Sequence, residues 1–189
     1  MIALDPRFAA LVLIDLQAGI VSRQLAPRGG PDVVNAGRML AERFRAARSP
    51  VVLVRAAFAA DFADAPPGLV DEPMPRPEGG FPPDWTSLAD GLAEPTDILI
   101  TKRQWGAFYG TELDLQLRRR GVRTLVIGGV ATNFGVESTV RQAWEYGYDV
   151  CVAEDACASV SAELHDVAIR HIFPRAARVV QAADIAFAA

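Results

Sequence analysis

Two residues of opposite charge each stand at the end of an apolar run, a placement that suits acid–base chemistry. Asp15 follows the run Leu11–Ile14, and Lys102 follows Ile98–Ile100 by way of Thr101. A carboxyl group at the end of a buried strand loses its water, which raises its pKa and lets it act as a general acid near neutral pH. An ammonium group in the same crevice can hold an anionic substrate or the negative charge that develops in a transition state.

Each of these residues also has a structural interpretation. Asp15 could hydrogen-bond the next turn or cap a helix, and Lys102 could be a surface residue whose stem lies along apolar neighbours. The two charges also act against each other, because a nearby ammonium lowers the carboxyl pKa that burial raises. The sequence leaves the roles of both residues and the protonation state of Asp15 open.

A glycine-containing turn follows a third apolar run, Leu125–Ile127. Gly128 and Gly129 come next, and a helix begins at Thr132 or Asn133. A strand, a tight turn and a helix N-terminus together present backbone N–H groups and a positive dipole end to an anion. The alternative is a plain strand-to-helix turn with Thr132 or Asn133 as its N-cap, and both interpretations can hold at once.

These segments need a scaffold that brings separate strands to one edge. Short runs that are apolar on both faces alternate with helical patterns, which is typical of a parallel sheet covered on both sides. We expect strands at 12–14, 51–54, 98–100, 125–127 and 150–153, with 179–180 as a candidate edge strand. We expect helices at 33–47, 111–120, 133–146 and 162–172, and then a terminal helix. The predicted fold is a three-layer, Rossmann-like α/β fold with five or six parallel strands, in one domain over residues 1–189.

In such sheets, ligands bind beyond the C-terminal ends of the strands, at a switch point in strand order. Asp15, Lys102 and the turn at 128–135 all fall at such ends, so we expect them to meet in one crevice. The segment 57–95 is rich in Pro, Gly and Asp and contains four aromatic residues. So long a loop is usually functional or mobile. It could form a lid or wall over the crevice, or it could dock against a partner subunit.

The composition limits the class of protein. The chain has 189 residues, of which 51% are hydrophobic and 22% are charged, as in a globular domain. A net charge of −4 gives no electrostatic basis for binding nucleic acid. No apolar run approaches the roughly 20 residues that span a membrane, and no secretory signal is apparent. Cys151 and Cys157 do not make a disulfide framework, so we expect a cytoplasmic protein with free thiols.

Four segments, in this order, carry a resemblance to the isochorismatase-like hydrolases, also called the cysteine hydrolase family: Leu11–Gln17, Thr101–Leu113, Leu125–Thr139 and Tyr148–Ala156. The resemblance covers about residues 10 to 160. It implies an α/β hydrolase, commonly a homo-oligomer (a dimer or larger), that acts on a small molecule. It also implies that Asp15 and Lys102 are catalytic. The peptide between the positions of Val130 and Ala131 is often cis in the family, and the amides around Val130, Ala131 and Thr132 would help to form an oxyanion pocket.

Gly135 stands where most members of that family carry a nucleophilic cysteine. A thiolate cannot act from this position, so the chain resembles the cysteine-free branch, which includes the true isochorismatases. In that branch the aspartate is thought to protonate the methylene carbon of an enolpyruvyl ether, and water captures the cation. We therefore expect Asp15 to act as a general acid on a small anionic substrate, with an enolpyruvyl (vinyl) ether as the candidate. Two alternatives stay open: an amide hydrolase that uses Asp15-activated water, and a non-catalytic small-molecule-binding protein.

Several residues are candidates for the substrate pocket: Gln17, Arg55, Trp105, Phe108, Tyr109 and Asn133. Arg55 would suit a carboxylate, whereas the aromatic residues could equally pack in the core. Gln17 could orient Asp15 or a water molecule, or it could be a structural amide.

We expect neither a metal ion nor another cofactor. The resemblance places the metal ligands of nicotinamidase-like members after the second strand, and residues 55–65 contain no histidine. His165 and His171 are six residues apart on one late helix, which is not the spacing of a helical metal pair. Both histidines are expected at the surface or at an interface.

Overall fold

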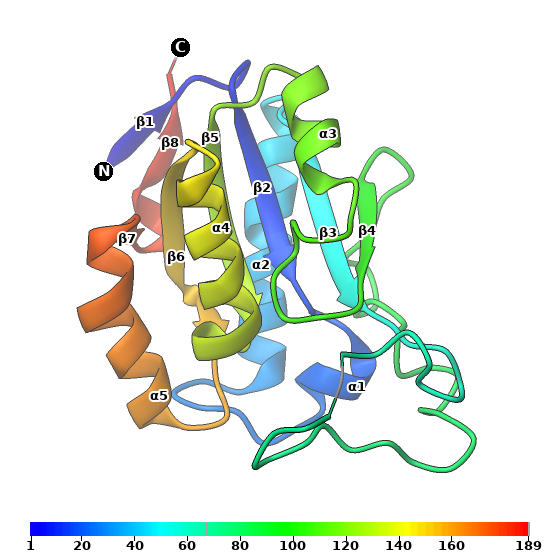
Figure 1. Cartoon of the computed structure of the whole chain (residues 1–189). Coiled ribbons are helices and arrows are strands. Elements are labelled where there is room, and N and C mark those ends of the chain that lie inside the picture. Colours follow the sequence, from blue (N-terminus) through cyan, green and yellow to red (C-terminus); the bar gives the residue numbers. More distant parts are fainter. Residues whose placement is uncertain (67, 189) are drawn as a thin grey trace.

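A six-stranded parallel sheet forms the centre of the molecule in the computed structural model, in the order β4-β3-β2-β5-β6-β7 (Figure 1). Its strands are β2 (Ala9–Ile14), β3 (Val51–Ala56), β4 (Ile98–Lys102), β5 (Thr124–Val130), β6 (Asp149–Ala158) and β7 (Arg178–Val180). The structure describes residues 1–66 and 68–188, so residue 67 of the long loop and residue 189 of the predicted domain lie outside the described residues. The predicted α/β fold and parallel sheet are confirmed.

The strands are buried on both faces, which explains their continuous apolar runs. All six residues of β2 are buried. Leu11 and Leu13 belong to the core on one face of the sheet, while Val12 and Ile14 belong to the core on the other. Successive side chains of a strand point to opposite faces, so a strand in the middle layer must be apolar at every position.

Helices cover the two faces of the sheet. Figure 1 shows α2 (Gly30–Ala46) behind the sheet and α3 (Leu113–Arg119) and α4 (Glu137–Glu145) in front of it. The short α1 (Ala18–Val21) follows β2, and α5 (Ala162–Val167) continues into a π-helical turn at Ala168–Ile172 and a 3₁₀ turn at Phe173–Arg175. These layers agree with the predicted three-layer arrangement.

The C-terminal segment differs from the prediction. The expected terminal helix is wrong: a 3₁₀ turn at Ala182–Asp184 leads into β8 (Ile185–Phe187), which pairs in parallel with β1 (Ile2–Leu4). Figure 1 shows β1 and β8 side by side in this small second sheet. Pairing with β1 buries Ile185, and Arg43 of α2 donates hydrogen bonds to the carbonyls of Ala182 and Ile185. These non-local contacts override the helix preference of an alanine-rich segment.

The strand order reverses between β2 and β5, and this reversal determines where a site can form. From β2 the chain continues to β3 on one side, whereas β5 lies on the other side of β2. A crevice outside the C-terminal ends of the strands opens at such a point. Asp15 follows β2 and the turn at 131–135 follows β5, so both lie at the switch point.

The long loop between β3 and β4 is anchored next to this point. Phe81 and Trp85 stack with their ring centroids 4.2 Å apart, and Phe58 and Phe62 pack against them. The backbone N–H of Ala18 donates to the carbonyl of Ser87, which ties the loop to the start of α1. The loop therefore has an aromatic core of its own and lies near the C-terminal ends of β2 and β3 (Figure 1).

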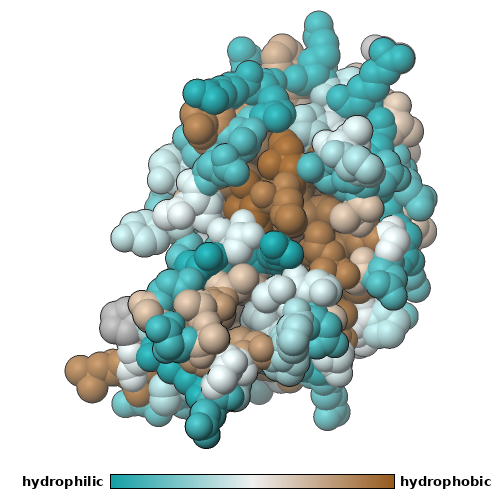
Figure 2. Space-filling view, turned by 90° about the vertical axis from the view of Figure 1, so that its right-hand side faces the viewer, coloured by the Kyte–Doolittle hydropathy of each residue, from teal (hydrophilic) through white to brown (hydrophobic). Residues whose placement is uncertain are grey.

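The outer face of the molecule beside β4 is partly apolar. Figure 2 shows apolar side chains gathered in the middle of this face, within a polar surround. Leu99 on the edge strand β4 is among the exposed large apolar residues. Within residues 1–66 and 68–188, none of the helices has the length and apolar character needed to cross a membrane.

Candidate active site at the switch point

Asp15 and Lys102 form a buried ion pair. Asp15 Oδ2 lies 2.8 Å from Lys102 Nζ, and the two side chains are 9% and 1% exposed. Lys102 Nζ also donates a 2.6 Å hydrogen bond to the carbonyl of Trp105. The structure thus brings together two residues that are 87 positions apart in the sequence, at the C-terminal ends of two strands.

The local backbone turns Asp15 out of the strand pattern. Its φ of 53° is in the left-handed region, and its N–H still donates to the carbonyl of Val54 on β3 at 2.8 Å. Aspartate is one of the few non-glycine residues that adopt this conformation readily. The strand hydrogen bonds therefore end at Asp15, and its carboxyl group turns toward Lys102.

Opposing effects act on the pKa of Asp15. Burial raises the pKa of Asp15, while the charge and hydrogen bond of Lys102, with a smaller effect of the Ala56 backbone amide, lower it. Burial is the largest effect, and the pKa lies above its ordinary value. Oδ1 is buried and has no hydrogen-bond partner within residues 1–66 and 68–188. The carboxyl group therefore takes up a proton at a higher pH than an ordinary aspartate, and Oδ1 is the oxygen left without a partner in the described part of the chain.

Gly135 faces this pair directly. A Cβ atom on Gly135 would lie 3.0 Å from Lys102 Nζ, 3.1 Å from Ile14 Cγ2 and 3.3 Å from Asp15 Oδ2. Such distances are shorter than ordinary van der Waals contact. Any side chain at position 135 would therefore touch both charged atoms, and the glycine places no side-chain atom against them.

The turn between β5 and α4 lies against the end of β2. Its Val130–Ala131 peptide is cis, as the family resemblance implies. Gly129 has a φ of 126°, and a Cβ there would lie 2.1 Å from the carbonyl oxygen of Ile14. Only glycine allows the two backbones to approach so closely. The turn is thereby held next to Asp15.

The start of the following helix differs from both capping predictions. The segment Thr132–Val136 is a π-helical turn that leads into α4, and its N-cap residue is Ala131. Thr132 Oγ1 is hydrogen-bonded to His165 Nδ1 at 2.8 Å, and Asn133 Oδ1 accepts a hydrogen bond from Ser159 Oγ. Neither side chain is free to cap the helix.

One histidine lies elsewhere than predicted. His165 is buried, whereas a surface or interface position was expected; His171 is exposed. Polar partners on both ring nitrogens explain how His165 is accommodated in the interior. Its partner residues lie far away in the sequence, so no local pattern marks them.

Gln17 and Arg55 do not reach the pair. Gln17 is buried; its Nε2 donates to the carbonyls of Ala56 and Trp85 at 3.0 Å each, and its Oε1 accepts from the N–H of Ala56 at 2.8 Å. Arg55 Nε donates to Thr101 Oγ1 at 3.3 Å, its register partner on β4. Alternation along β4 places Thr101 and Lys102 on opposite faces, so Arg55 shares the face away from Lys102.

The three aromatic candidates have different surroundings. Trp105 is 63% exposed, and its ring centroid lies 4.8 Å from that of Phe134, which directly precedes Gly135. Tyr109 is 73% exposed, while Phe108 is buried in the core beside Tyr146 and Tyr148. Only Trp105 is linked to the pair, through its carbonyl. Phe134 is a neighbour that sequence reasoning missed, although its position before Gly135 is a usable signal.

Among the described residues, no activated thiol replaces the nucleophilic cysteine that most family members carry at position 135. Cys157 is buried and donates to the carbonyl of Ala153, and burial raises its pKa to about 12. Burial also raises the pKa of Cys151. The hydroxyl of Thr139 donates to the carbonyl of Gly135 at 2.7 Å and accepts from the N–H of Ala107. Across residues 1–66 and 68–188 there is also no group of three His, Cys, Asp or Glu residues that could hold a metal ion.

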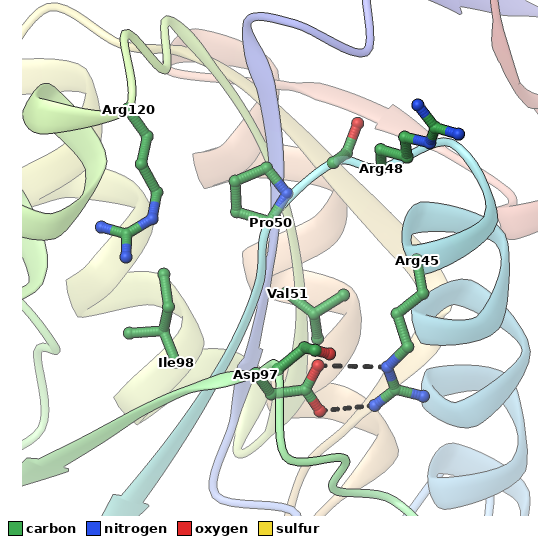
Figure 3. A pocket seen from close by; sticks show the side chains of 9 residues that line it. Arg45, Arg48, Pro50, Val51, Asp97, Ile98 and Arg120 are labelled. Carbon is green, nitrogen blue, oxygen red and sulfur yellow. Dashed lines mark hydrogen bonds and ion pairs between the residues drawn. The ribbon is translucent and has the colours of Figure 1, made fainter.

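Two surface hollows lie at the other end of the sheet. One, of about 340 Å³, is drawn in Figure 3 at the starts of β3 and β4, where the Arg45 guanidinium is turned toward the carboxylate of Asp97. The other, of about 430 Å³, includes Thr124, Asp149 and Arg178 at the starts of β5, β6 and β7. Neither of these two hollows is lined by Asp15, Lys102 or Gly135.

Comparison with known proteins gives a consistent result. The isochorismatase domain model matches residues 9–184. The chain is 49% identical over 186 residues to the uncharacterized isochorismatase family protein YecD of Escherichia coli O157:H7, covering 98% of each chain. It is 34% identical over 194 residues to the ureidoacrylate amidohydrolase RutB of Methylobacterium radiotolerans, covering 90% of this chain and 75% of that protein. The solved structure of an isochorismatase family protein from Burkholderia thailandensis superimposes with a TM-score of 0.91 at 44% identity, over 97% of this chain and 95% of that one.

Proposed function

The chain belongs to the isochorismatase family, and on that premise we propose that it is a hydrolase that works without a cysteine nucleophile. One observation carries the proposal: the Asp15–Lys102 pair faces position 135, where the chain has no side chain. The thiols of the described residues are buried and have raised pKa values. Asp15 is then the group best placed for proton transfer.

We take the substrate to be a small anionic vinyl ether of the enolpyruvyl type. Protonated Asp15 gives the proton of its free oxygen to the methylene carbon, and the ether carbon becomes an oxocarbenium ion. Water adds to this cation and returns a proton to Asp15. The resulting hemiketal then collapses to a keto acid and an alcohol. Acid, substrate and water thus suffice, and no covalent enzyme intermediate is needed.

Lys102 has two tasks in this scheme. Before proton transfer it attracts the anionic substrate toward the crevice. After transfer its ammonium, 2.8 Å from Oδ2, stabilises the carboxylate that Asp15 has become. The low exposure of both side chains strengthens this interaction, because the effective dielectric is lower in the interior than in water.

Amide hydrolysis is the second candidate. It is supported by the relative RutB, which is named a ureidoacrylate amidohydrolase. In this scheme ionised Asp15 would act as a base and activate water for attack on the amide carbon. The raised pKa of Asp15 works against that role, because it disfavours the ionised form.

The test is a product assay on the purified chain with enolpyruvyl ethers, including isochorismate, and with a panel of amides. Our proposal predicts release of keto acid from the ethers. In D₂O the new methyl group should contain one deuterium, since the methylene carbon takes its proton from a solvent-exchanged acid. Ammonia from amides, without keto acid from ethers, would instead establish the second candidate. A ligand that raises thermal stability but is recovered unchanged would indicate a binding protein.

A further inference from the structure

A chain of polar side chains joins four segments behind the turn that follows β5. Thr132 Oγ1 lies 2.8 Å from His165 Nδ1, and His165 Nε2 lies 3.1 Å from Glu154 Oε1. Arg28 Nη2 donates to the same Glu154 oxygen at 2.8 Å. Thr132 and His165 are both buried. The series runs from the loop before α2, through β6 and α5, to the turn itself.

The charge of Glu154 determines which atoms donate and which accept along this series of hydrogen bonds. Burial raises the pKa of Glu154, but hydrogen bonds from Gln181, Arg28 and His165 outweigh burial and hold the pKa below its ordinary value. Glu154 is therefore a carboxylate that accepts, so His165 Nε2 carries a proton. In the neutral ring, Nδ1 then accepts the hydrogen bond of the Thr132 hydroxyl.

Glu154 is itself firmly held. Arg28 Nη1 donates to the backbone carbonyls of Glu154 and Cys157 at 2.9 and 2.8 Å, and Gln181 Nε2 donates to Glu154 Oε2 at 2.8 Å. The carboxylate that orients His165 is thus held in place by Arg28 and Gln181. Polar groups in the interior are tolerated when every partner is satisfied, and such networks make their surroundings rigid.

The far end of the series is the turn that faces the Asp15–Lys102 pair. Thr132 directly follows the Val130–Ala131 peptide and begins the π-helical turn that contains Gly135. Asn133, the next residue, accepts a hydrogen bond from Ser159. Two successive residues of the turn are therefore held by side chains from outside it.

We propose that His165 is a positioning residue for this turn. It fixes Thr132 and, through Thr132, the backbone amides near Ala131 and the distance of Gly135 from Asp15 and Lys102. His165 acts through Thr132 and touches no reacting atom. The coupling between His165 and the turn stands independently of the proposed hydrolysis; its effect on turnover rests on that proposal.

Two substitutions at His165 separate its two hydrogen bonds. The amide of His165→Asn reaches the place of Nδ1 and can keep the link to Thr132. The longer His165→Gln reaches the place of Nε2, so it keeps the link to Glu154 and loses Thr132. The exposed His171→Asn is the matched control. A second pair, Thr132→Ser and Thr132→Val, keeps or removes the hydroxyl without touching His165.

The first readout is amide hydrogen exchange over residues 128–137, and the second is kcat and KM measured separately. We expect His165→Gln and Thr132→Val to speed amide exchange in this segment by about tenfold or more. In both variants, the fold-decrease in kcat should be larger than the fold-change in KM. His165→Asn and Thr132→Ser should stay near the wild type, as should His171→Asn.

Equal effects of His165→Asn and His165→Gln, or unchanged exchange at 128–137 in both His165→Gln and Thr132→Val, would overturn the proposal. If the wild type hydrolyses none of the substrates offered, the exchange data alone decide whether His165 positions the turn. Failure of the proposed function is thereby distinguished from failure of this inference.

Discussion

Lys102 reaches Asp15 across the end of a strand that separates them. Lys102 ends the edge strand β4, Asp15 follows β2, and β3 lies between these two strands. The 2.8 Å ion pair therefore links two strands of the sheet that do not pair with each other. A long, flexible lysine stem suits this span, and burial of the stem along apolar neighbours places the ammonium beside the carboxyl group.

The pH dependence of kcat distinguishes the two candidate reactions. The pKa of Asp15 is raised, so its protonated form persists to a higher pH than that of an ordinary aspartate, whose pKa is 3.8. If Asp15 is the acid, kcat should be constant at low pH and fall as pH rises through the raised pKa. A base would give the opposite slope, with kcat rising over the same interval. A full pH–kcat profile on the hydrolysed substrate decides the matter.

Gly135→Ala should impair the site while leaving the fold intact. The added Cβ would lie 3.0 Å from Lys102 Nζ and 3.3 Å from Asp15 Oδ2, so the ion pair must shift. We expect kcat to fall by about tenfold or more, because small displacements of reacting groups are costly. Circular dichroism should be unchanged. Undiminished turnover in Gly135→Ala would show that catalysis does not require position 135 to be free of a side chain beside Asp15 and Lys102.

Gly135→Cys tests a different point with the same residue. It places a thiol next to the pair, and amide or nitrile hydrolysis that appears only in this variant would indicate a pocket suited to the cysteine mechanism. Activity on vinyl ethers should be lower than in the wild type, for the steric reason given for alanine. A variant that gains no activity on amides or nitriles would show that the pocket is not adapted to a thiol.

Gly129→Ala should destabilise the protein strongly. Its Cβ would collide with the Ile14 carbonyl at 2.1 Å, and its φ of 126° is unfavourable for alanine. We expect a loss of at least about 2 kcal/mol in the free energy of unfolding. Gly147→Ala is the control, since φ there is 80° but no atom of the described residues, apart from the chain neighbours, would lie within 4 Å of the added Cβ; its cost should be about 1 kcal/mol. Urea unfolding of both variants measures the difference, and equal costs would argue against close backbone contact.

Gln17→Ala should act on stability rather than on substrate binding. The Gln17 amide donates to the backbone carbonyls of Ala56 and Trp85 and accepts from the backbone N–H of Ala56. Removing it leaves buried backbone groups without partners, at a cost of about 2 kcal/mol. We expect a lower unfolding midpoint and, well below it, an unchanged KM. A raised KM without loss of stability would assign Gln17 to the substrate after all.

The sheet and its central pair could be predicted because fully buried strands appear as uninterrupted apolar runs. Those runs locate the strand ends, and the strand ends locate Asp15, Lys102 and the turn. The face on which Arg55 lies follows from strand pairing together with the alternation of side chains. Arg55 pairs with Thr101, so its side chain lies on the face of the sheet away from Lys102. That assignment needs the pairing of β3 with β4, which the sequence alone does not provide.

The buried histidine and the C-terminal strand could not be predicted in the same way. The partners of His165 lie 33 positions away at Thr132 and 11 positions away at Glu154. Both partners lie on other elements than α5, so nothing near position 165 distinguishes a buried ring from an exposed one. Likewise, β8 exists because β1, at the opposite end of the chain, pairs with it. Both features come from tertiary contacts that local preference does not encode.

The central claim, that Asp15 supplies the proton, is tested most directly by kcat of Asp15→Asn on the substrate hydrolysed by the wild type. The amide has nearly the shape of the carboxyl group but cannot serve as the acid. We predict a loss of about 10²- to 10⁴-fold in kcat, with an unchanged circular dichroism spectrum at a temperature where both proteins are folded. Turnover at the wild-type rate in folded Asp15→Asn would contradict the account.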